Sequence, residues 1–161
     1  MKSIFRLSPA LLALTFLGMA AKKPVTVRFF VEANAQDTEK FAVPIMLRNP
    51  PRQAFIEKFP TIHERLIQAI YPFQAVDGSW GCAFKLNDSG RLDLEVLSTA
   101  MRGKSIVAFI GTKAGSHQAV DMQIDKPVHD GIISIPYGLT ELEVAALTHE
   151  FPIIGQAKKR K

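Results

Sequence analysis

The side chains best suited to chemistry gather between His117 and His129. Three carboxylates, Asp121, Asp125 and Asp130, lie in or beside the same stretch. Neutral imidazole nitrogens and carboxylate oxygens are common zinc ligands, so these residues are a candidate surface metal site. A metal-binding or hydrolytic enzyme centred on a hairpin between His117 and Asp130 is therefore one interpretation of the sequence.

The spacing of these residues argues against that interpretation. The chain has four histidines, at positions 63, 117, 129 and 149, and they form neither a His-x₃-His nor a His-Glu-x-x-His pattern. The Gly-x-Ser-x-Gly turn of a serine hydrolase is also absent. Residues 111–115 carry two glycines and a lysine without phosphate-loop spacing, which favours a hairpin turn. We therefore predict no catalytic residue, no metal ligand and no cofactor.

Cys82 is the only cysteine, so an intramolecular disulfide is impossible. It lies in residues 80–86, where Trp80, Cys82, Phe84 and Leu86 would share one face of a strand. We predict a buried and unreactive thiol. A reactive nucleophile is the alternative, but no histidine or cation stands beside Cys82 to lower its pKa.

The N-terminus has the organisation of an export signal. Residues 1–6 carry Lys2 and Arg6, residues 7–21 are uncharged, and the segment closes on small residues. We predict a signal peptide over residues 1–20, with cleavage after Ala20 or, alternatively, after Ala21. An uncleaved membrane anchor is disfavoured because spanning needs about 20 apolar residues. A periplasmic or secreted protein, without stable membrane insertion after cleavage, is expected.

The charge of the chain is concentrated at its ends. The net charge is +5, which falls to +3 without Lys2 and Arg6 and to −1 without the four basic residues 158–161. Domains that bind nucleic acids carry a basic surface, whereas the folded part of this chain is nearly neutral, so no nucleic-acid partner is expected. We predict a single α+β domain over residues 21–155 and a basic flexible tail over residues 156–161. The tail could bind anionic lipid, but a solvated tail is preferred.

Apolar periodicity places several strands. Residues 25–32 alternate, with valines and Phe29 on one face and Thr26, Arg28 and Glu32 on the other, which indicates a half-buried strand. Residues 41–47 form a second β-prone run in which Pro44 predicts an edge strand. Residues 53–59 alternate again. The continuous apolar run of residues 105–110 indicates a strand at the sheet centre.

Three helices are expected. Thr61 and Glu64 form a capping box that predicts a helix over residues 61–70, and Thr140 and Glu143 form another before a helix that ends ahead of Pro152. A third helix is expected over residues 87–102. A hairpin signal at residues 130–131 precedes a return strand over 132–135. The order predicts an α+β fold, a mostly antiparallel sheet with about three helices packed on it.

From residue 53 to about 155 the sequence resembles the periplasmic head domain of SecD, a protein-export subunit. The matching positions are Pro60, Thr61, Ala69, residues 83–86, Gly90, Thr99, residues 103–104 and 106–110, Ile124, Gly131, Ile133, Ile135, Leu139, Thr140, Glu143, Ala145 and Leu147. The resemblance implies a SecD-head-like fold without the transmembrane motor of that family, because the chain stops at Lys161. Residues 25–47 have no counterpart in the resemblance.

These observations favour an exported, non-enzymatic binding or interaction protein. Exported polypeptides or envelope proteins are the expected partners, and the sequence leaves the oligomeric state open. Binding is expected at an exposed sheet edge or hairpin, because unpaired strand edges are templates for extended peptides.

Overall fold

The computed structural model describes residues 25–34, 36 and 41–156. The predicted signal peptide and residues 157–161 of the predicted tail lie outside this part of the chain. Within it no helix is long and apolar enough to cross a membrane.

The central sheet has four antiparallel strands in the order β4-β1-β7-β8. These are β4 (Ile62–His63), β1 (Thr26–Val31), β7 (Ser105–Thr112) and β8 (Gly115–Gln123). The prediction that the apolar run at residues 105–110 lies at the sheet centre is confirmed, because β7 pairs on both sides and most of its side chains are buried.

A second antiparallel sheet packs against the central sheet, with β5 (Ile67–Gln74), β6 (Trp80–Leu86) and β9 (Ile132–Leu139) in that order. The main core lies between the two sheets. The rings of Phe29 on β1 and Phe84 on β6 meet edge to face there, with centroids 5.8 Å apart. Burying such side chains is the main source of stability in a fold of this kind.

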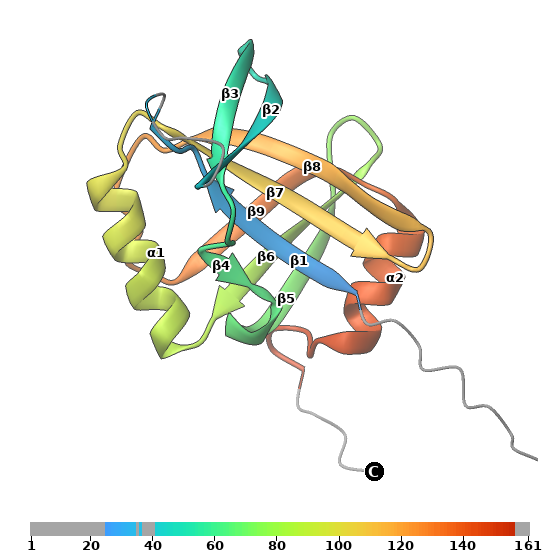
Figure 1. Ribbon diagram of the computed structural model, residues 1–161. Coiled ribbons are helices and arrows are strands. Elements are labelled where there is room, and N and C mark those ends of the chain that lie inside the picture. Colours follow the sequence, from blue (N-terminus) through green and yellow to red (C-terminus); the bar gives the residue numbers. More distant parts are fainter. Residues whose placement is uncertain (1–24, 35, 37–40, 157–161) are drawn as a thin grey trace, which may run out of the picture.

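A hairpin of β2 (Ala42–Arg48) and β3 (Pro51–Glu57) covers part of the other face of the central sheet (Figure 1). Leu47, Ala54 and Ile56 of this hairpin pack on Val107 of β7 to make a smaller second core. The central sheet is therefore buried on one face and only partly covered on the other.

Two α-helices flank the sheets, α1 (Asp88–Ala100) and α2 (Glu141–Glu150). The Asn87 side chain caps α1 by accepting a hydrogen bond from the amide of Gly90 at 2.9 Å. The capping box predicted for Thr140 and Glu143 is present at the start of α2. Both helices lie where the sequence predicted them.

The helix predicted over residues 61–70 is wrong. These residues form β4, a 3₁₀ turn η1 (Glu64–Leu66) and the start of β5. Residues 67–74 read Ile-Gln-Ala-Ile-Tyr-Pro-Phe-Gln, which favours a strand, and seven of them pair with β6. The described residues therefore hold two α-helices rather than about three, within the predicted α+β, mostly antiparallel fold.

The hairpin predicted at residues 130–131 is also wrong, because β8 and β9 belong to different sheets. β9 pairs instead with β6, which buries Ile133 and Ile135 in the main core. The Gly131 carbonyl, just before β9, accepts a hydrogen bond from the amide of Leu86 at the end of β6, at 2.9 Å. The φ of Gly131, +69°, is a conformation in which glycine is favoured.

The end of the described chain closes the outer edge of β5. Ile153 pairs in parallel with Ile70, the Ile70 amide donates to the Pro152 carbonyl at 2.9 Å, and the Ile154 amide donates to the Ile70 carbonyl at 2.8 Å. An edge that would otherwise expose its backbone groups is thereby partly covered.

Candidate functional site

The candidate site is a groove of about 260 Å³ between the β2–β3 hairpin and the uncovered part of the central sheet. It is lined on the sheet side by Arg28 and Phe30 of β1 and Phe109 of β7, and on the hairpin side by Val43 and Ile56. Alternation along β1 explains this placement: Val27, Phe29 and Val31 face the main core, so the intervening side chains face the groove.

Two aromatic rings form the floor of the groove. The rings of Phe30 and Phe109 meet edge to face, with centroids 5.5 Å apart and an interplanar angle of 87°. Both side chains are only partly buried, and both pack against the second core. The site therefore offers apolar surface that is held in place by the hairpin but is still open to solvent.

Two strongly exposed aromatic residues, Phe41 and Phe59, lie at the open end of the hairpin, outside the lining of the groove. The side chains of Phe41 and Phe59 are 70% and 82% exposed. Lys58, which lines the groove, precedes Phe59 and bonds through its amide to the Phe41 carbonyl at 3.2 Å. Exposed aromatic residues beside a groove are typical of surfaces that bind other molecules.

The charges of the groove are mixed in sign. Lys58 and Glu57 line it from the hairpin, and Arg28 lines it from β1. Arg28 lies 3.6 Å from Glu64, and both side chains are partly exposed, so this ion pair is weak. The groove therefore combines an apolar floor with polar groups of both signs at its sides.

The hairpin turn is fixed to the central sheet by the buried carboxylate of Asp121 on β8. It accepts hydrogen bonds from the Asn49 amide at 2.8 Å, the Arg48 amide at 3.1 Å and the Gln118 side chain at 3.0 Å. Hydrogen bonds to an ionised acceptor are stronger than those between neutral groups.

Glu32, just after β1, holds the hairpin at a second point. Its carboxylate lies 2.6 Å from the Arg52 guanidinium and accepts the Ser105 amide at 2.9 Å. The Arg52 hydrogen bond, aided by the Ser105 amide, lowers the pKa of Glu32 despite the opposing effect of burial. The hairpin is therefore placed by specific polar contacts as well as by apolar packing.

The outer edge of β2 is not paired with any strand of the described chain. The Lys58 amide donates a hydrogen bond to the Phe41 carbonyl, so these two residues are a hydrogen-bonded pair of the β2–β3 ladder. In an antiparallel ladder such pairs recur at every second residue. The backbone groups of the residues between them on β2, Ala42, Pro44 and Met46, therefore point away from β3. The prediction that Pro44 lies on an edge is thus confirmed. Since Pro44 has no N–H, this edge offers an incomplete ladder to an added strand.

The structure does not bring the histidines and aspartates between positions 117 and 130 together. Nδ1 of His117 faces Glu143 of α2 at 3.4 Å, whereas Nδ1 of His129 lies 2.9 Å from Glu95 of α1. Asp130 accepts the amide of Ile132, and Asp125 is exposed in the loop after β8. No group of three metal-binding side chains exists among the described residues.

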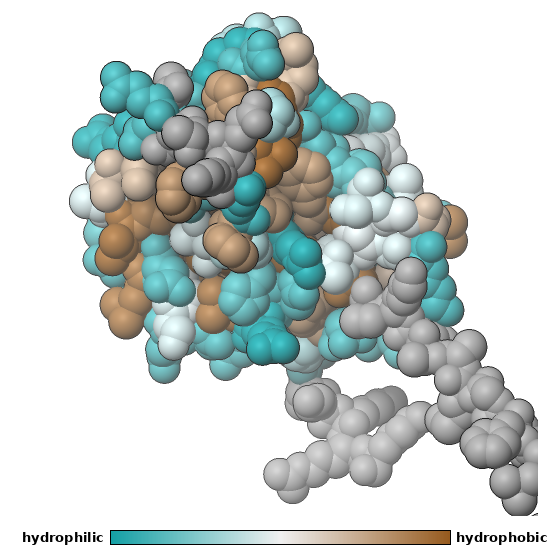
Figure 2. Space-filling view, viewed as in Figure 1, coloured by the Kyte–Doolittle hydropathy of each residue, from teal (hydrophilic) through white to brown (hydrophobic). Residues whose placement is uncertain are grey.

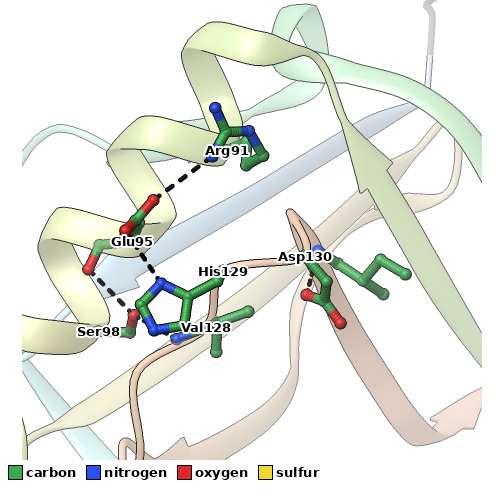
Figure 3. Close-up of polar contacts among 7 residues, drawn as sticks. Arg91, Glu95, Ser98, Val128, His129 and Asp130 are labelled. Carbon is green, nitrogen blue, oxygen red and sulfur yellow. Dashed lines mark hydrogen bonds and ion pairs between the residues drawn. The ribbon is translucent and has the colours of Figure 1, made fainter.

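Figure 3 shows how the loop before β9 is attached to α1. Glu95 lies between His129 and Arg91, and the hydroxyl of Ser98 accepts the amide of Val128 at 2.8 Å. The side chain of Asp130 points toward the start of β9, away from this cluster. These contacts fix a loop rather than assemble a catalytic group.

Cys82 is fully buried in the main core, as predicted. Burial raises the pKa of its thiol to about 12, so thiolate is scarce at neutral pH.

Phe30 and Phe109 were not expected as site residues from the sequence. The signal for Phe30 was present, because an aromatic residue interrupts the polar face of β1.

Comparisons with known proteins bear on the fold. No protein-family model and no curated protein matches the sequence. A solved structure of SecDF, described as a membrane component that enhances protein export, matches with a TM-score of 0.54 and 12% identity over 85% of this chain and 70% of that one. SecDF in a super-membrane-facing form matches with a TM-score of 0.51 and 12% identity.

The second match covers 81% of this chain but only 19% of the SecDF chain. At 12% identity these likenesses concern the fold alone. The resemblance to a SecD domain that the sequence predicted from residue 53 onward is confirmed at that level.

Proposed function

We propose that this protein is a non-enzymatic binding module related to protein export, acting in the periplasm or as a secreted protein. In this proposal residues 1–20 are removed and residues 21–155 act as one domain. The likeness in fold to a SecDF structure described as enhancing protein export supports the export relation. The basic start and apolar run of the N-terminal sequence support the location.

The groove beneath the hairpin is the observation that carries the proposal. Its floor of Phe30 and Phe109 is apolar and open, and the exposed Phe41 and Phe59 lie next to Lys58 of its lining. A folded protein seldom leaves so many aromatic side chains accessible around one concavity unless they contact another molecule. The ligand class that fits is an extended polypeptide segment with apolar side chains, such as an exported polypeptide or a segment of an envelope protein.

The groove and the edge of β2 would have different parts in binding. Side chains of the ligand would lie against the aromatic floor, which supplies most of the affinity. Met46, which is exposed on the outer edge of β2, offers the ligand a backbone hydrogen-bonding position. Pro44 limits further pairing, so the edge would orient a bound segment rather than extend the sheet by a full strand.

Fluorescence anisotropy with a labelled, reduced and carboxymethylated polypeptide that cannot refold tests this proposal. The double variant Phe41→Ser with Phe59→Ser should bind this probe about tenfold more weakly, because truncating aromatic contacts at an interface typically costs more than 1 kcal/mol. Both side chains are exposed, so folding should be unaffected.

The matched control is Leu142→Ser, which removes an exposed apolar side chain on α2, away from the groove. This variant should bind as the wild type does. Equal weakening by both changes would indicate non-specific adhesion to exposed apolar residues, and no binding by the wild-type protein would contradict the proposal.

A further inference from the structure

The groove between the hairpin and the central sheet reaches the start of β1. Thr26, Arg28 and Phe30 all line it, so it follows this strand for about 13 Å, at a rise of about 3.3 Å per residue. Figure 2 shows hydrophobic surface beside the hairpin, where the central sheet is uncovered. Thr26 comes directly after Val25, the first residue that the structure describes. Residues 1–24 therefore join the folded domain at one end of the groove.

Small residues leave this end of the groove open. Gly111 of β7 pairs with Thr26 of β1 on one side and with Ser116 of β8 on the other. A side chain at position 111 would clash with the Thr26 hydroxyl. The hairpin packs on β7 farther along, at Val107. A chain that reverses its direction just before Thr26 therefore has an open path onto the aromatic floor.

The adjoining part of the sequence has the chemistry that the groove accepts. Residues 7–21 are uncharged and rich in leucine, and they include Phe16 and Met19. Burial of these side chains against the aromatic floor would remove apolar surface from water. Because the run has no charge, it brings no like charge to the groups of both signs at the sides of the groove.

The length of this part of the chain is sufficient to cover the groove. Residues 22–24 are Lys-Lys-Pro, and proline favours turns. If the chain reverses there, residues 16–21 can run back along β1, because six extended residues span about 20 Å. That length exceeds the distance from Thr26 to Phe30, so the apolar run can reach the whole floor.

Attachment to the same chain makes even a weak contact effective. A segment joined through a short linker has an effective concentration in the millimolar range. A separate polypeptide at micromolar concentration must compete with it. The apparent affinity for that polypeptide falls in proportion to the fraction of time for which the groove is open.

From the position, chemistry and length of this segment, we propose that residues 7–21 occupy the groove of their own chain until they are removed. Other polypeptides then gain access to the groove only in the processed protein. This inference concerns the regulation of the site and rests on the proposed function.

Fluorescence anisotropy with the carboxymethylated polypeptide compares the processed protein, residues 21–161, with the full chain. Residues 25–151 make the two cores, so both forms keep the fold. The processed protein should bind about tenfold more tightly, which corresponds to a groove that is open for about a tenth of the time in the full chain. Equal binding by the two forms would overturn this inference and leave the proposed function standing. A processed protein that does not bind would contradict the proposed function itself.

Two double variants of the full chain test the apolar run directly. Leu14→Asp with Leu17→Asp should bind the probe about as tightly as the processed protein does, because burying a charged side chain in an apolar groove is unfavourable. The matched control is Leu14→Met with Leu17→Met, which keeps the run apolar and should bind as weakly as the unchanged full chain. If the two double variants bind equally, the run does not close the groove.

A spin label on the full chain with Thr15→Cys locates the segment. Cys82 is buried, so the label attaches at position 15. The NMR signals of the Val43 and Phe109 amides should broaden, and they should recover in the double aspartate variant. The amides of α1, on the opposite side of the molecule from the start of β1, should be unaffected (Figure 1). Broadening that increases with protein concentration would place the run in the groove of a second copy and would overturn the inference.

Discussion

At the scale of single residues, Asp121 shows how a candidate catalytic group can have a structural task. It is 3% exposed, and its carboxylate is occupied by two backbone amides of the hairpin turn and by Gln118. The sequence marks Asp121 only as an acidic residue near two histidines. Its partners Arg48 and Asn49 are more than seventy positions away, and no local pattern reveals a contact of that range.

We predict that Asp121→Ala lowers the free energy of unfolding by about 1–3 kcal/mol, because two amides lose their acceptor. Asp121→Asn, which keeps one oxygen acceptor, should lose less. Urea denaturation of the three proteins measures the difference. Wild-type stability in the alanine variant would mean that water replaces the carboxylate at no cost.

Cys82 predicts a dependence of stability on alkaline pH. Its pKa is raised from 9.0 to about 12 by burial, so the folded state keeps its proton where the unfolded state loses it. The stability that this group contributes is complete below pH 9.0 and is lost as the pH rises toward 12, by at most about 1.4 kcal/mol per pH unit.

Urea denaturation of wild type and Cys82→Ala at neutral pH and at about pH 10 isolates this effect from other groups that titrate in the range. The wild type should lose more stability than the variant on going to the higher pH. Parallel losses in the two proteins would show that the thiol ionises as readily in the folded as in the unfolded state.

At the scale of elements, local signals predicted a structure correctly where the element could be specified by its own residues. Alternation identified β1, an N-cap identified α1, and a capping box identified α2. The same type of capping signal failed at Thr61, because Ile67 and Ile70 gain more by pairing with β6 and entering the core than by forming a short helix.

Strand pairing was the part of the fold that local patterns could not specify. Residues 130–131 are Asp-Gly, a common turn sequence, which predicted a hairpin between the strands on either side. The strand that follows instead pairs with β6, more than forty residues earlier, where Ile133 meets Phe84 and Ile135 meets Cys82. The partner of a strand is decided by which faces can be buried together, and that information is spread over the chain.

The capping box of α2 provides a test of a correctly predicted element. The Thr140 hydroxyl accepts the Glu143 amide at 3.3 Å, and the Glu143 carboxylate accepts the Thr140 amide at 2.8 Å. Thr140→Ala should lower the free energy of unfolding by about 1 kcal/mol, and Thr140→Ser should lower it less. Thermal or urea denaturation decides between this outcome and a helix held by packing alone, for which the two variants would match the wild type.

At the scale of the whole molecule, the sequence predicted the fold class and the resemblance but only part of the groove. Pro44 correctly marked the edge of β2. The floor was missed because Phe30 and Phe109 lie on strands distant in sequence and become neighbours only when β1 pairs with β7. A surface site shared by three elements requires the topology before its members can be recognised.

The proposed location is also a property of the whole chain. We predict that protein recovered from an exporting cell begins at Ala21 or Lys22, since a signal peptidase accepts the small residues before these positions. N-terminal sequencing measures this directly. A recovered protein that still begins with Met1 would contradict the export signal and, with it, the proposed periplasmic or secreted location.

The pairing of β1 with β7 has a consequence for the order of assembly. Residues 26–31 cannot enter the central sheet until residues 106–111 are available, and the β5 edge waits for Ile153. Contacts between such distant residues slow folding. The central sheet of a chain emerging from the ribosome could therefore not close until most of the chain had been made. If the proposed export is correct, the central sheet would close only after the polypeptide has crossed the membrane.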